Sequence, residues 1–112
     1  MSQIDEDIAS FYQRKASLEW IIQDHTKWIS EYLTIRETLP DWRTKEGNFI
    51  KIKDMTDLHL HNVISYLRTK DPNDTHHWIN VFCQEQKYRQ LRCEINTLIE
   101  ELRDIEKVDT LI

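Results

Sequence analysis

The chain has 112 residues, a mass of 13.7 kDa and a net charge of −5. This length allows one domain with a core, but it excludes a large enclosed active site together with a second domain. The only glycine, Gly47, excludes a dinucleotide fingerprint, which needs three glycines, and a Walker loop, which needs two. The acidic balance argues against a protein that neutralises the phosphates of duplex DNA.

The sequence predicts a cytoplasmic protein with no membrane contact. No apolar run approaches the length of a transmembrane helix, and the acidic start lacks the apolar region of a signal peptide. Cys83 and Cys93 would lie about 15 Å apart on one helix, which is too far for a disulfide. We therefore expect reduced cysteines and an intracellular location.

Residues 3–38 are predicted to form one long helix. Apolar side chains recur at spacings of three and four, with Lys15 and His25 as breaks in the stripe. A second apolar line, which includes Trp20 and Trp28, indicates a helix that is covered on more than one side. Pro40 ends the helix, because the residue before a proline is disfavoured in helical conformation.

Residues 41–53 switch to a period of two, which predicts a small β-hairpin that turns at Gly47-Asn48. A short helix follows over 55–69, capped by Asp54 or Thr56. Its apolar stripe is Leu60, Val63, Ile64 and Leu67.

A second long helix is predicted over 75–110, with a cap at Asn73, Asp74 or Thr75. It carries a sustained heptad seam, in which the spacing alternates between three and four residues. The seam consists of Tyr88, Leu91, Ile95, Leu98, Leu102 and Ile105.

Together these elements predict a mainly α fold in a single domain, 1–112. The two long helices form an antiparallel hairpin, and the β-hairpin and short helix are inserted between them. Each long helix spans about 50 Å, whereas a compact domain of this size has a radius of gyration of about 13 Å. The apolar faces exceed what one hairpin buries, so we expect a homo-oligomer with coiled-coil packing.

Basic residues are concentrated in the centre of the chain. Residues 1–40 and 74–112 each carry a net charge of −3, whereas residues 41–73 carry +1. A symmetric oligomer would bring several copies of this segment together, which is one way for an acidic protein to build an anion pocket. The alternative is a solvated hairpin of mixed charge.

The centre also contains the polar side chains that could bind a ligand. His59 and His61 point about 200° apart on a helix, so they cannot ligate one metal ion together. His59, Asn62 and Tyr66 do share a face and could bond a nucleobase or phosphate, although a solvated face is the alternative. No nucleophile motif is present, so we expect neither catalysis nor a cofactor or metal.

The central segment resembles a pattern found in small bacteriophage and prophage proteins. The resemblance covers about 42–67, and the flanking helices lie outside it. The matching residues are Trp42-Arg43-Thr44, Gly47, Ile50-Lys51-Ile52, Asp54-Met55-Thr56-Asp57, His59-Leu60 and Asn62-Val63-Ile64.

The resemblance implies an anti-defence protein in the cytoplasm of an infected host cell. Some such phage proteins are oligomeric sponges that hold cyclic nucleotides or cyclic ADP-ribose isomers. A similar role here would place phosphate or ribose contacts on the polar residues and base stacking on Trp42. The candidate ligand-binding residues are Trp42, Arg43, Thr44, Lys51, His59, Asn62 and Tyr66. The alternatives are a protein that inhibits a host defence enzyme by direct contact, and a small enzyme that degrades a nucleotide signal.

Overall fold

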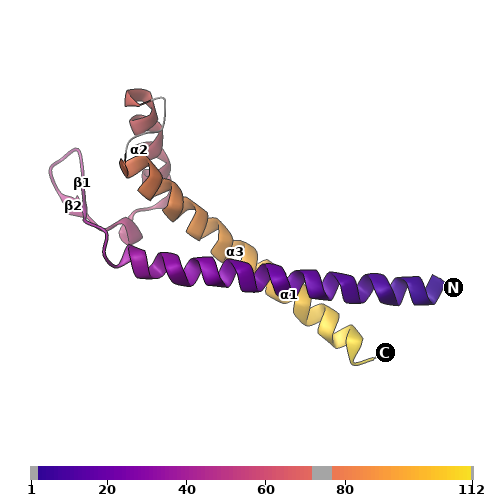
Figure 1. The fold of residues 1–112 in the computed structure, drawn as a ribbon. Helices are drawn as coiled ribbons and strands as arrows, with labels where there is room; N and C mark the ends of the chain where they lie inside the picture. The colour runs from indigo at the N-terminus through magenta and orange to yellow at the C-terminus, as the bar shows by residue number, and fades with distance from the viewer. Residues whose placement is uncertain (1–2, 72–76, 112) are drawn as a thin grey trace. The chain divides into compact units, whose positions relative to one another are not determined.

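The computed structural model describes residues 3–71 and 77–111, and they form a mostly helical protein (Figure 1). Helix α1 (Gln3–Arg36) is followed by strands β1 (Trp42–Arg43) and β2 (Phe49–Ile50) and a short 3₁₀ helix, η1 (Ile52–Asp54). Helices α2 (Asp57–Lys70) and α3 (His77–Asp109) complete the order. The predicted combination of three helices and a small two-stranded antiparallel sheet is confirmed.

The chain divides into two compact units, and α1 and α3 each contribute to both. Unit 1 contains residues 1–29 and 91–112, and unit 2 contains residues 30–90. The β-hairpin, η1 and α2 therefore belong to unit 2, together with one end of α1 and one end of α3.

In unit 1, α1 and α3 run antiparallel, because later residues of α1 contact earlier residues of α3. Lys15 pairs with Asp109 at 3.3 Å, and His25 lies 3.3 Å from Glu94. The two breaks in the apolar stripe of α1 thus both face acids of α3. Leu18, between them, is completely buried.

In unit 2, α2 and the start of α3 form a continuous apolar core with the segment that follows the hairpin. Leu60, Ile64 and Leu67 come from one face of α2, as their spacing predicts. Phe82 is completely buried and stacks on Trp78, with ring centroids 5.4 Å apart. The remaining buried members of this core are Ile52, Met55, Ile79 and Val81.

The β-hairpin turns at Gly47, as predicted. Trp42 faces Ile50 and Arg43 faces Phe49 across the two strands. The amide of Gly47 donates to the carbonyl of Thr44 at 2.9 Å, and Gly47 has a φ of 86°. Glycine adopts this left-handed conformation without the steric cost that a Cβ imposes. It therefore closes a hairpin loop of the type in which a turn is followed by a left-handed residue.

The predicted hairpin over 41–53 is wrong beyond Ile50, because residues 52–54 form η1. The amides of Asp54 and Met55 donate to the carbonyls of Lys51 and Ile52. In a 3₁₀ helix, side chains three residues apart lie on the same side. Ile52 and Met55 both enter the core in this way, at 3% exposure each, whereas a strand would have sent them to opposite faces.

The helix ends also differ from the prediction by one or two residues. Helix α1 ends at Arg36 rather than residue 38, since the chain turns before Pro40 with the amide of Leu39 bonded to the carbonyl of Arg36. Helix α2 begins at Asp57 rather than residue 55, because the hydroxyl of Thr56 caps it. Helix α3 ends at Asp109 rather than residue 110. Its predicted cap at residues 73–75 lies outside the described residues.

Candidate functional site

A cavity of about 520 Å³ lies in unit 2 between the β-hairpin and α2. We call it the hairpin–α2 cavity. Its volume is within the range of small-molecule sites, which is about 300–1,000 Å³. It brings together six of the seven candidate residues from the sequence. Its lining residues are Trp42, Arg43, Thr44, Lys45, His59, Asn62, Val63 and Tyr66.

The hairpin supplies one wall of this cavity. Trp42 is half-buried, and its ring meets the rings of Trp78 and Phe82 edge to face, each with centroids 5.1 Å apart. These contacts with the core fix the indole in place. Thr44 is held by its own turn, where its hydroxyl accepts a hydrogen bond from the amide of Asn48 at 3.2 Å. The hairpin wall is therefore held by the contacts of Trp42 with the core and by the hydrogen bond of Thr44 within the turn.

Helix α2 supplies the opposite wall. His59, Asn62 and Tyr66 are spaced by three and four residues, so they share one face of α2 with Val63 between them. His59 is half-buried, whereas Asn62 and Tyr66 are exposed. The side chain of Lys70 lies over the Tyr66 ring, 5.7 Å from its centroid. This wall offers an imidazole, an amide and a phenol to a ligand.

The charge of the cavity is positive. Arg43 and Lys45 are both exposed and both come from the hairpin, and among the described residues no carboxylate lines the cavity. Guanidinium and ammonium groups are the usual partners of phosphate and carboxylate. The combination of two cations with an indole and a phenol suits an anion that also carries a flat ring.

Lys51, the seventh candidate residue, does not line this cavity. It lines a separate space of about 200 Å³ with Arg36, Glu37, Asp41 and Lys53, together with Leu39 and Ile52. Lys51 is therefore separate from the cavity that the other six residues line, and its role as a ligand contact stays a prediction. The reason is local, because the chain leaves the strand after Ile50 and winds into η1.

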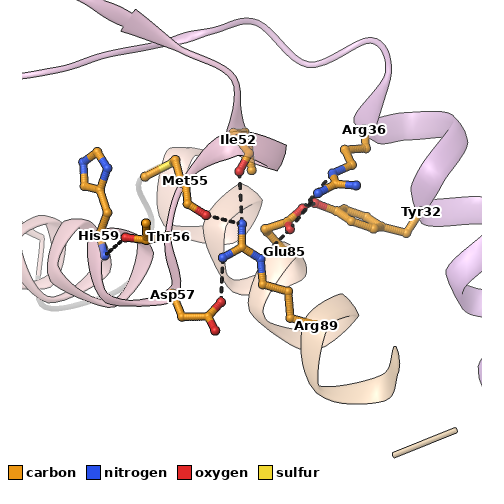
Figure 2. Close-up of polar contacts among 9 residues, drawn as sticks. All are labelled: Tyr32, Arg36, Ile52, Met55, Thr56, Asp57, His59, Glu85 and Arg89. Atoms are coloured by element: carbon orange, nitrogen blue, oxygen red, sulfur yellow. Dashed lines mark hydrogen bonds and ion pairs between the residues drawn. The ribbon is translucent and has the colours of Figure 1, made fainter. Parts of the chain in front are cut away.

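Unit 2 also contains a buried ionic cluster that the sequence did not predict (Figure 2). Glu85 of α3 is completely buried. Its carboxylate accepts hydrogen bonds from the Tyr32 hydroxyl at 2.7 Å, from Arg36 Nη2 at 3.1 Å and from Arg89 Nε at 2.8 Å. Burial, together with the bond to Glu85, raises the pKa of Tyr32 well above its ordinary value of 10.0.

Arg89 connects this cluster to the start of α2 (Figure 2). Its Nη2 donates to the backbone carbonyls of Ile52 at 3.2 Å and Met55 at 2.7 Å, and its Nη1 donates to Asp57 at 2.7 Å. Burial alone would lower the pKa of Arg89, but its bonds to Asp57 and Glu85 raise the pKa above its ordinary value. The available signal in the sequence was the spacing of Glu85, which lies three residues after Phe82 and three before Tyr88 and so shares a helix face with both.

Within residues 3–71 and 77–111, no three His, Cys, Asp or Glu side chains are grouped so that they could hold a metal ion. In the same ranges no helix combines the length and the apolar character that crossing a membrane requires. Comparison with protein-family models, curated proteins and solved structures finds no match to this chain.

Proposed function

We propose that this protein binds and sequesters a small nucleotide-type molecule in the hairpin–α2 cavity without cleaving it. The observation that supports the proposal is the convergence of Trp42, Arg43, Thr44, His59, Asn62 and Tyr66 on one cavity. These residues come from the hairpin and from α2, and the sequence predicts each of them as a ligand contact. A solvated hairpin of mixed charge would not require them to share a cavity.

In this proposal each wall of the cavity has its own task. Arg43 and Lys45 bind the phosphate, because they are the cations of the hairpin wall. Trp42 and Tyr66 contact the flat faces of the base. Asn62 carries both a donor and an acceptor in its amide, so it pairs with the edge of a base or with ribose hydroxyls. His59 completes the polar wall beside Asn62.

The biological setting of the proposal comes from the resemblance of residues 42–67 to small phage proteins. A phage protein that holds a nucleotide immune signal would blunt host defence simply by lowering the free concentration of the signal. Sequestration needs no nucleophile, which agrees with a cavity whose polar groups are suited to binding. The alternative of a degrading enzyme differs from sequestration because it requires that the bound molecule be converted to a product.

Calorimetric titration with ADP-ribose, cyclic ADP-ribose and 3′,5′-cyclic AMP tests the proposal directly. We expect at least one of them to bind and to raise the melting temperature, because a ligand that binds only the folded state stabilises it. Mass spectrometry after heat denaturation of the complex should recover that molecule intact. If none of the three binds, the nucleotide proposal is wrong, and recovery of a cleaved product would favour the enzyme.

We also propose that the chain self-associates through α1 of unit 1. Trp20 is 66% exposed, and it borders a shallow groove formed with Ala16, Ser17 and Ile21. A large ring beside small residues on one helix is self-complementary, because a two-fold axis would seat each Trp20 in the groove of the other copy. The competing occupant is a host protein, which belongs to the alternative of inhibition by direct contact.

Light scattering at micromolar concentration separates these possibilities. We expect a mass above 13.7 kDa for the wild type and a shift toward 13.7 kDa for Trp20→Glu. Leu58→Glu is the matched control, because Leu58 is 69% exposed but lies on α2 in unit 2. A wild type that is monomeric, or a Trp20→Glu variant with an unchanged mass, contradicts self-association through this surface.

A further inference from the structure

The side chain of Arg89 contacts both its own helix and the segment that leads into α2. Three of its nitrogens contact Glu85 on its own helix, Asp57 at the start of α2, and the backbone carbonyls of Ile52 and Met55. A guanidinium is suited to this task because its donors lie in one rigid plane. The side chain is thus a bridge between α3 and the segment that leads into α2 (Figure 2).

The bonded carbonyls lie where the chain changes direction. Ile52 belongs to η1, and Met55 is the residue immediately before the Thr56 cap. The cap hydroxyl accepts the amide of His59 at 3.1 Å, and the Thr56 carbonyl accepts the amide of Leu60 at 2.9 Å. His59 is the first residue of α2 that lines the cavity. Its amide bonds to Thr56, and the preceding residue, Met55, bonds to Arg89.

The buried carboxylate of Glu85 orients the side chain of Arg89. Glu85 is completely buried and receives Arg36 and Tyr32 from α1 as well as Arg89. A buried ionic cluster is often no more stabilising than apolar residues of the same volume, and its best-attested role is to select one arrangement. The bond to Glu85 thus favours the side-chain conformation of Arg89 that reaches the carbonyls of Ile52 and Met55.

We infer that Arg89 is a positioning residue for the hairpin–α2 cavity. It fixes η1 and the first turn of α2, and thereby sets where His59 and Asn62 stand relative to the hairpin. The inference rests on the proposed function in that the side chains it positions are those proposed to bind the ligand. Arg89 itself is not among the residues that line the cavity.

Amide hydrogen exchange of Arg89→Lys, measured without ligand, tests this inference. A lysine keeps the positive charge next to Glu85 but cannot reach a second carboxylate and two carbonyls at once. We expect exchange to become about tenfold faster at the amides that hold η1 and the α2 cap. These reporter amides belong to Asp54, Met55, His59 and Leu60.

Val81→Ala is the matched control, because Val81 is buried in the same core of unit 2 but lies outside the Arg89 contacts. Its loss of packing should accelerate exchange throughout unit 2 rather than at the four reporter amides. If Arg89→Lys accelerates exchange uniformly, or leaves the reporters unchanged, the inference is overturned. Since no ligand is present, failure of the wild type to bind nucleotides would count against the proposed function alone.

Discussion

Tyr32 and Glu85 are 53 residues apart in the sequence, yet the tyrosine hydroxyl donates to the carboxylate at 2.7 Å. Both side chains are buried in unit 2. Tyr32→Phe should lower the free energy of unfolding by about 1–3 kcal/mol, because a buried carboxylate then loses one of its donors. Urea denaturation measures this loss. Tyr12→Phe is the control, because its hydroxyl donates to Asp109 at an exposed site, and a smaller loss is expected there.

The same hydrogen bond predicts a pH dependence. The pKa of Tyr32 is raised in the folded state, so the protein keeps this proton above pH 10 while the unfolded chain releases it. The stabilising contribution is therefore complete below pH 10 and is lost as the pH rises above it. The difference in unfolding free energy between wild type and Tyr32→Phe should therefore be smaller at pH 11 than at pH 8. A gap that is constant with pH would contradict the raised pKa.

The separation of Lys51 from the hairpin–α2 cavity predicts different effects for Arg43, which is part of the hairpin, and Lys51, which follows the hairpin. Arg43→Ala should weaken binding of the best nucleotide probe by about tenfold or more, because a charged hydrogen bond to phosphate is lost. Lys51→Ala should leave the affinity unchanged, since its side chain lines the other space. Calorimetry on both variants decides the matter. Equal losses would mean that the ligand spans both spaces.

Gly47→Ala should destabilise the hairpin even though there is room for the added methyl group. The nearest atom to an added Cβ is Arg43 Nη2 at 3.9 Å, which is an ordinary contact. The cost comes from the φ of 86°, which an alanine adopts at about 1–2 kcal/mol. Gly47→Asn should cost less, because asparagine tolerates this conformation better. Thermal unfolding of the two variants provides the comparison, and an equally stable Gly47→Ala contradicts the explanation.

In unit 1, Arg14 and Glu101 form an exposed bidentate pair, with distances of 2.9 and 3.0 Å. The hydrogen bond from Arg14 lowers the pKa of Glu101 below its ordinary value of 4.5. The pair therefore favours the folded state above that pH and loses its effect as the pH falls through the pKa of the folded protein. Arg14→Gln should raise the pKa of Glu101, which a carbon-detected NMR titration measures. An unchanged pKa would show that the pair does not persist in solution.

Periodicity predicted the long helices, and turn chemistry predicted the hairpin, because both signals are local. Gly47 marked the turn, and Thr56 was one of two predicted caps for α2. The end of the second strand could not be predicted in this way. Whether Ile52 continues a strand or enters a 3₁₀ helix depends on where the core lies, and the alternating pattern around it fits both.

The sequence predicts which residues of α2 group together at the candidate site, but it does not predict which neighbouring residues lie outside the cavity. His59, Asn62 and Tyr66 share a face by helical spacing alone, so their grouping followed from the sequence. Lys51 lines a separate space because the chain turns into η1 after Ile50, and the sequence pattern does not indicate this turn. The buried ionic cluster was not predicted for another reason. Tyr32 and Arg36 reach Glu85, and Asp57 reaches Arg89, only through tertiary packing.

The two polar interruptions of the α1 stripe restrict how that helix can pair with α3. A purely apolar seam would accept a slip of one heptad, since apolar residues would still meet apolar residues. Such a slip would move Lys15 from Asp109 to a position opposite Leu102, where its ammonium group would lose its carboxylate. Lys15 therefore favours one register of α1 against α3. A chain carrying Lys15→Leu should keep its helices but populate more than one pairing frame.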